Sequence, residues 1–305
     1  MSNRDDVREF LTTRRAKVTP EQVGLPGGQN RRVPGLRRGE VAMLADVSVE
    51  YYSRIERGDL SGASEPVLFA IADALRLSDA ERDHLFDLAR ASSSSPLRRT
   101  KRTVRARGIR PGLQLILDNV TAGPAIVRNG RLDVLGTNRL ARAMYSDLFP
   151  NAALLTDGSI PNLARYTFLD RPRSDAFHPD WELAADQTVA ILRTTAGKDP
   201  YDKALQDLVG ELSTRSPEFR QRWGAHDVRR HAIGEKHFQH PMVGPLDLIY
   251  EGADLMADDD LSLLFYTAEP GSPTAERLQL LANWAATHEH DAATAAGSPA
   301  TAADA

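Results

Sequence analysis

The feature that most constrains the fold is the segment 38–58, RGEVAMLADVSVEYYSRIERG. Its apolar residues recur at helical spacing on both sides of a short polar turn. Two helices that cross at a tight turn need small side chains where they touch, and Ala42 and Ala45 supply them. The turn also needs a residue that tolerates positive φ, and Asp46 stands there. The segment therefore predicts a helix-turn-helix.

The second helix of this pair has one buried and one outward side. Val47, Tyr52 and Ile55 share the buried side, and Ser48 is placed to cap the helix. Such a cap leaves the first backbone N–H groups available for a phosphate. The outward residues, with Tyr51 at the edge, are Val49, Glu50, Ser53, Arg54 and Arg57.

An outward face of this kind predicts reading of double-stranded DNA in the major groove. Arg54 is suited to a bidentate contact with guanine, and Glu50 to accepting a hydrogen bond from cytosine. The alternative is a plain helical hairpin with solvated charges. The residues predicted to contact phosphates are Arg31, Arg32, Arg37, Arg38 and Arg57.

The distribution of charge agrees with a DNA-binding N-terminal half. The whole chain has a net charge of −4, but residues 1–110 hold 21 Lys and Arg against 15 Asp and Glu, a net of +6. The remainder holds 17 against 27, a net of −10. A basic binding module joined to an acidic regulatory module gives this asymmetry, although unequal surface charge without function is the alternative.

Segments with the composition of linkers predict how the chain is divided into domains. Segment 91–96, ASSSSP, is a linker candidate, and a basic run follows it. We expect a helix-turn-helix domain at 1–91, a basic linker at 92–110, a second domain at 111–291 and a disordered tail at 292–305. The basic run is either a solvated linker or an arm on the DNA backbone.

The first domain is predicted to be all-α. Val7, Phe10 and Leu11 form one apolar stripe. A second stripe runs from Val67 to Leu75 after Ser64 as N-cap, and Ser78 with Glu81 forms a capping box before a further helix.

The second domain is predicted to be α+β with an antiparallel sheet. Asn129-Gly130 between two apolar runs predicts a type I′ hairpin, and the alternation at 246–251 and the run 261–267 predict further strands. The stretches expected to be helical are 138–145, 162–169, 180–196, 202–214 and 217–224, with another helix starting at Ser272-Pro273.

Several chemistries lack their sequence signals. The chain has no cysteine, which fits a reducing interior and excludes thiolate catalysis. His231, His237 and His240 do not complete a zinc-ligand spacing, so no metal site is expected. No phosphate-binding loop, dinucleotide fingerprint or nucleophile elbow is present. Because these motifs are absent, we expect that the protein is not an enzyme. Because the N-terminus is polar and no long apolar run is present, we expect a cytoplasmic protein without membrane contact.

Several blocks of the sequence, in the same order along the chain, resemble blocks of a known protein family. Residues 4–90 resemble the xenobiotic-response-element class of bacterial helix-turn-helix regulators, with a lambda-repressor-like fold. Segments 18–26 (VTPEQVGLP), 32–37 (RVPGLR) and 47–57 (VSVEYYSRIER) are similar to the subgroup with an MmyB-like C-terminal domain. The matching blocks of the second half are 133–138 (DVLGTN), 178–181 (HPDW), 212–220 (LSTRSPEFR), 223–228 (WGAHDV), 240–244 (HPMVG) and 266–272 (YTAEPGS).

The resemblance implies a PAS-like sheet with helices and an apolar pocket suited to a fatty-acyl ligand. A bound fatty acid as effector is the only cofactor that we expect. One departure is Gly136-Thr137, where many members have a tryptophan before the asparagine, which affects the shape of the pocket. The residues predicted to bind the ligand are Ile126, Leu135, Asn138, Phe168, Trp181, Phe219, Arg222, Trp223, His226, Tyr250 and Tyr266.

Each of these residues also has a structural interpretation. Large apolar side chains of this kind more often belong to the core than to the wall of a ligand pocket. Arg222, His226 and Arg229 are suited to hold a carboxylate head group, or they form a surface cluster.

Two hypotheses about function follow. In the first, an apolar effector binds the C-terminal domain of a homodimer and shifts its affinity for an operator, which we expect to be an inverted repeat because paired heads read two half-sites. In the second, the acidic domain binds another protein and no small molecule is involved. A third, weaker reading is an enzyme that acts on an acyl substrate.

Overall fold

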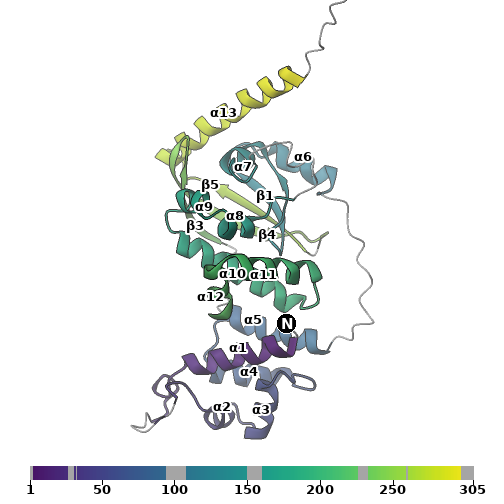
Figure 1. Ribbon diagram of the computed structural model, residues 1–305, viewed down its shortest axis with the longest axis vertical. Coiled ribbons are helices and arrows are strands. Elements are labelled where there is room, and N and C mark those ends of the chain that lie inside the picture. Colours follow the sequence, from purple (N-terminus) through teal and green to yellow (C-terminus); the bar gives the residue numbers. More distant parts are fainter. Residues whose placement is uncertain are drawn as a thin grey trace, which may run out of the picture. The chain divides into compact units, whose positions relative to one another are not determined.

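A computed structural model describes residues 3–26, 31, 33–93, 108–149, 160–225, 233–258 and 260–296. The chain divides into two compact units, shown in Figure 1. One comprises Met1–Val104 with Ala185–Arg230, and the other comprises Arg105–Ala184 with His231–Ala305. Most of the predicted linker, residues 94–107, lies outside the described residues.

The first unit is helical over its described residues, which confirms the all-α prediction. A short 3-10 helix, η1, spans Glu21–Val23. Its α-helices are α1 (Asn3–Lys17), α2 (Arg38–Leu44), α3 (Val49–Glu56), α4 (Glu65–Ala74), α5 (Asp79–Ser93), most of α10 (Trp181–Lys198), α11 (Lys203–Arg215) and α12 (Pro217–Ala225).

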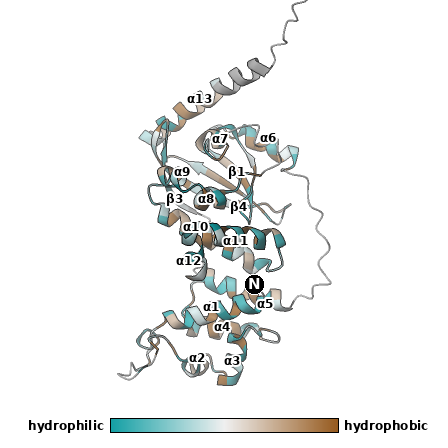
Figure 2. Cartoon of the chain, in the orientation of Figure 1, coloured by the Kyte–Doolittle hydropathy of each residue, from teal (hydrophilic) through white to brown (hydrophobic). Residues whose placement is uncertain are grey.

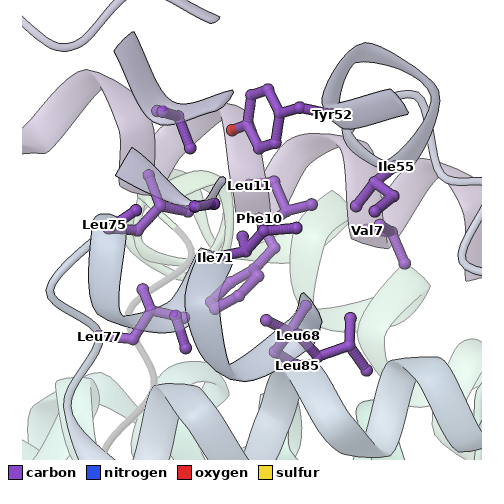
Figure 3. Packing of buried hydrophobic residues seen from close by; sticks show 14 of the residues in the cluster. Val7, Phe10, Leu11, Tyr52, Ile55, Leu68, Ile71, Leu75, Leu77 and Leu85 are labelled. Atoms are coloured by element: carbon purple, nitrogen blue, oxygen red, sulfur yellow. The ribbon is translucent and has the colours of Figure 1, made fainter. Parts of the chain in front are cut away.

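The apolar stripes read from the sequence form the core of helices α1 to α5. Val7, Phe10 and Leu11 of α1 are fully buried, as Figure 3 shows. They pack in one cluster with Ile71 of α4 and Leu85 of α5. Figure 2 shows hydrophobic and hydrophilic residues alternating along these helices, so each buries one face and leaves the other in water.

The tight turn between α2 and α3 has the predicted geometry. Asp46 adopts a φ of 52°. Ser48 is the N-cap of α3, and its side chain accepts a hydrogen bond from the Tyr51 backbone N–H at 3.0 Å. The capping box of Ser78 with Glu81 is also present before α5. Local sequence chemistry therefore fixes where α3 begins.

A buried carboxylate ties α1, α2 and α3 together. Glu56, at the end of α3, is 1% exposed. Its oxygens accept hydrogen bonds from Thr12 at 3.0 Å, from Arg15 at 2.8 and 3.2 Å, and from Arg38 at 3.1 and 3.4 Å. Burial would raise the pKa of Glu56, but these donors outweigh burial and lower it. The carboxylate is therefore ionised and held between three helices.

We predict that Glu56→Ala lowers the free energy of unfolding by roughly 3 kcal/mol, because it leaves Arg15 partly buried without its counter-charge. Urea unfolding of the full chain, followed by far-UV circular dichroism, measures the change. Glu65→Ala, at an exposed position of α4, is the control and should change stability by at most about 0.5 kcal/mol. Equal changes in the free energy of unfolding for the two substitutions would contradict this stabilising role of Glu56.

The second unit contains a five-stranded antiparallel sheet in the order β2-β1-β5-β4-β3, which confirms the predicted α+β class. The strands are β1 (Ala125–Asn129), β2 (Val134–Thr137), β3 (Ile233–His240), β4 (Gly244–Asp254) and β5 (Leu261–Thr267). The helices are α6 (Pro111–Asn119), α7 (Arg139–Met144), α8 (Leu163–Leu169), α9 (Arg171–Phe177), the first residues of α10, and α13 (Pro273–Ala296).

The predicted type I′ turn at Asn129-Gly130 is wrong, although β1 and β2 do form a hairpin. Positive φ occurs at Leu132, at 68°, and at neither Asn129 nor Gly130. The Leu132 N–H donates to the Asn129 carbonyl, and the Asn129 side chain accepts from the backbone N–H groups of Arg131 and Asp133. The asparagine thus builds a longer loop with its own side chain, which competes with the two-residue turn.

The two faces of the sheet bury different clusters. Val127 of β1 and Leu263 of β5 pack with Leu117 of α6. On the other face, Ile126 of β1 packs with residues of β3, β4, β5, α7 and α13. The alternation of side chains along each strand divides them between the two faces.

Some elements of the structure differ from those predicted from the sequence. Helices α6 and α9 and strand β3 were not predicted. Helix α13 begins where Ser272-Pro273 predicts and continues to Ala296, past the expected start of the tail at 292. Residues 297–305 lie outside the described residues.

Candidate functional site

Helix α3 presents most of the residues predicted to read bases on an exposed face. Val49 is 45% exposed, and Glu50 and Arg54 are also exposed. Ser53 and Tyr51 are half-buried. The guanidinium of Arg54 lies 4.9 Å from the centre of the Tyr51 ring, and its Nε lies 3.9 Å from an oxygen of the Asp59 carboxylate. The aromatic face and this long, partly exposed ion pair together orient the cation.

The predicted phosphate contacts fall into different environments. Arg37 and Arg57 are exposed, at the N-terminal end of α2 and the C-terminal end of α3. Arg38 is 54% exposed along its side chain although it also holds Glu56. Arg32 lies outside the described residues.

Arg31 is the least available of the predicted phosphate contacts. Its two terminal nitrogens each donate to Glu40 at 2.7 Å, and one also donates to the Gly35 carbonyl at 3.0 Å. This pairing lowers the pKa of Glu40 to about 2, because it outweighs burial, which alone would raise the pKa. Arg31 therefore anchors the loop before α2.

Asn138 has a structural task in the second unit. Its side-chain oxygen accepts from the Ala125 and Ala141 backbone N–H groups, at 3.0 and 2.8 Å. Its amide nitrogen donates to the carbonyls of Val120 and Gly123, both at 2.7 Å. The predicted ligand contact at Asn138 thus has its hydrogen-bonding groups engaged in joining β1 to the start of α7.

Three of the predicted ligand residues, Ile126, Tyr250 and Tyr266, lie in one buried cluster on one face of the sheet. The hydroxyl of Tyr266 is 3.1 Å from that of Tyr145, at the end of α7. Burial raises the pKa of Tyr266 to about 12, so both hydroxyls are protonated hydrogen-bonding groups. Two basic residues absent from the sequence-based prediction lie beside this cluster. Arg128 is near all three tyrosines, and Lys236 lies over the Tyr250 ring.

Phe168 and Trp181 form a separate buried pair, with ring centres 5.7 Å apart. The Trp181 indole donates to the Thr167 carbonyl at 3.2 Å, and Arg171 stacks on its ring at 3.4 Å. Leu135 on β2 is half-buried.

The remaining predicted ligand residues belong to the other compact unit. Phe219 and Trp223 stack at 5.5 Å on α12. Arg222 donates to Asp186 at 2.9 Å and to the Glu218 carbonyl at 3.3 Å. His226 and Arg229 lie outside the described residues. The predicted ligand residues are therefore distributed over both units.

The departure at Gly136 has a structural correlate. A Cβ built on Gly136 would lie 2.3 Å from the Ile109 side chain. Ile109 packs with the Leu117 cluster on the opposite face of the sheet from Tyr266. A large residue at position 136 would thus require Ile109 to move.

Metal-binding groups and membrane-spanning helices are both absent from the described ranges. No three His, Cys, Asp or Glu side chains there are grouped to hold a metal ion. None of the helices described is both long enough and apolar enough to cross a membrane.

We predict that the second unit loses stability as the pH falls from about 6.5 to about 4. Burial lowers the pKa of His178 to about 4, so the unfolded chain takes up a proton in this interval while the folded chain does not. The loss should reach up to about 3 kcal/mol.

Urea unfolding at pH 7 and pH 5 measures this change, and His178→Phe, which fits its aromatic neighbours Phe177 and Phe238, should reduce the difference between the two pH values. The same difference in wild type and variant would show that another group is responsible.

Comparison with known families agrees with this geometry. Residues 7–85 match a helix-turn-helix domain family. Residues 109–281, more than half of the 305, match the MmyB-like transcription regulator ligand binding domain family. No curated protein matches the chain. The chain belongs to the MmyB-like transcription regulators, with an N-terminal helix-turn-helix domain and a C-terminal ligand-binding domain.

Proposed function

We propose that this protein is a sequence-specific transcription regulator that reads an operator through α3 and senses an apolar small molecule, a fatty acid, in its second unit. The observation that carries the DNA-reading part is the exposed Arg54, held on the Tyr51 ring in the last turn of a helix whose start is fixed by Ser48. An arginine oriented in this way is suited to the paired acceptors of guanine.

The ligand-sensing part is supported by the cluster around Tyr250 and Tyr266. One face of the sheet gathers tyrosine, phenylalanine and aliphatic side chains there, with the hydroxyls of Tyr145 and Tyr266 among them. Ligand sites are mostly apolar with a few placed polar groups, and this face has that composition.

A homodimer on an inverted repeat follows from the size of α3. Its eight residues, Val49–Glu56, reach few base pairs. Two helix-turn-helix domains in a dimer, with their α3 helices about one helical turn of DNA apart, read enough sequence for a specific site. The ligand would act by binding one of two arrangements of the paired DNA-binding domains more tightly than the other. The difference between these two affinities sets how far the equilibrium can shift.

One observation favours the alternative, a protein-interaction module. Leu115 and Ile116 are adjacent on α6 and are 64% and 59% exposed. Adjacent exposed aliphatic residues are found at protein contacts.

The test is selection of random duplex pools by the purified full chain at fixed salt, with Arg54→Ala alongside. We expect an inverted repeat from the wild type, and from Arg54→Ala a loss of about 1–3 kcal/mol of preference at one base pair in each half-site. Arg8→Ala, an exposed arginine on α1 outside the predicted surface, is the matched control and should select the wild-type site.

Absence of any enriched site, with affinity that only falls as salt rises, would reduce the first unit to a non-specific tether. Mass spectrometry of the denatured protein tests the ligand part. Recovery of an aliphatic compound supports it, whereas a partner protein captured through Leu115 and Ile116, with no compound bound, favours the alternative.

A further inference from the structure

Two basic residues of the sheet lie in the apolar cluster without a counter-ion. Arg128 stands on β1 beside Ile126, two residues away and therefore on the same face. Its Nε is shielded from solvent and lacks a hydrogen-bond partner. Within the part of the chain that the structure describes, the guanidinium forms no ion pair. The nearby groups that favour its charge are the hydroxyls of Tyr266, Tyr145 and Tyr250 and the carboxylate of Asp254.

Lys236 approaches one of these tyrosines, Tyr250, from β3. Its Nζ lies 4.8 Å from the centre of the Tyr250 ring. No ion pair involves it among the described side chains. Burial and the proximity of Arg128 lower the pKa of Lys236 to about 8, so it is still largely protonated at neutral pH.

The register explains why the two cations converge. Tyr250 pairs with Tyr266 on β5 and with Gly234 on β3. Lys236 is two residues from Gly234, and Arg128 approaches from β1 on the other side of β5. A Cβ at Gly234, where φ is 150°, would lie 3.2 Å from the Tyr250 ring, so glycine leaves this ring in place between the cations.

Two like charges in an apolar environment are unfavourable unless an anion compensates them. Asp254 on β4 and Arg128 on β1 both pair with Ser262, which lies between them on β5. Asp254 is exposed, however, and no ion pair joins it to Arg128. The anion must therefore come from outside the described chain.

We infer that Arg128 and Lys236 form the head-group site for the carboxylate of an aliphatic acid whose chain lies along the Ile126–Leu264–Leu248 face. This rests on the proposed ligand-sensing function and deepens it. The planar guanidinium can bind both carboxylate oxygens, and the ammonium adds a point charge. The tyrosine hydroxyls can donate further hydrogen bonds to the same oxygens.

The site differs from the head-group candidates in the sequence. Arg222 is already paired with Asp186, and it belongs to the other compact unit. Arg128 and Lys236, in contrast, share one face with the apolar residues that would hold the chain of the acid.

Isothermal titration of the full chain with dodecanoate, dodecan-1-ol and methyl dodecanoate tests the inference. The wild type should bind the acid at least about tenfold more tightly than the alcohol or the ester, as expected for charge-assisted hydrogen bonds. Lys236→Met and Arg128→Leu should each remove most of this preference, because they weaken binding of the acid far more than binding of the alcohol. Lys203→Met, an exposed lysine on α11, is the matched control and should keep it.

Thermal unfolding without added ligand separates binding from folding. Replacing an uncompensated, partly buried cation by an apolar side chain should leave the melting temperature unchanged or raise it. If Arg128→Leu does not fold, Lys236→Met decides.

The outcomes distinguish the two proposals. Equal binding of acid and alcohol by the wild type, or an undiminished preference in Lys236→Met, overturns the head-group site but leaves an apolar ligand in place. Binding of none of the three compounds overturns the apolar-ligand proposal and this inference together.

Discussion

The carboxylate of Glu56 lies inside the helical unit, where an ionised group is stable only because Thr12, Arg15 and Arg38 surround it. This one group joins the helix that begins the chain to both helices of the helix-turn-helix. Arg38 contributes to the network and is also half-exposed at the predicted DNA surface. The orientation of α3 toward a duplex thus depends on an interaction on its inner side.

Local chemistry made the DNA-reading unit predictable. The positive φ of Asp46 and the cap at Ser48 depend on residues within a few positions, so the sequence indicates them directly. The type I′ turn failed for a related reason: Asn129 favours the predicted turn, but its side chain also bonds the backbone of Arg131 and Asp133, and that competing local pattern prevails.

The charged groups inside the sheet unit were not predicted, because their meaning depends on distant strands. Arg128 follows Ile126 at strand spacing and Lys236 precedes Phe238 in the same way, a signal that a basic side chain faces inward. Only the strand order brings Arg128 of β1 and Lys236 of β3 to the same tyrosine, Tyr250. The predicted ligand residues Phe219 and Trp223 lie within the matched ligand-binding domain, residues 109–281, and in the compact unit that also contains α1 to α5.

In the proposed function, occupancy of the second unit by a ligand changes how tightly α3 binds DNA. The most direct measurement is the affinity of the full-length protein for its selected operator, at fixed salt, with and without saturating dodecanoate. We expect a change of about 5- to 150-fold, the usual range of coupling between two sites, with the same factor in the affinity for dodecanoate when operator is present. An operator affinity that stays the same while dodecanoate is bound would contradict the claim.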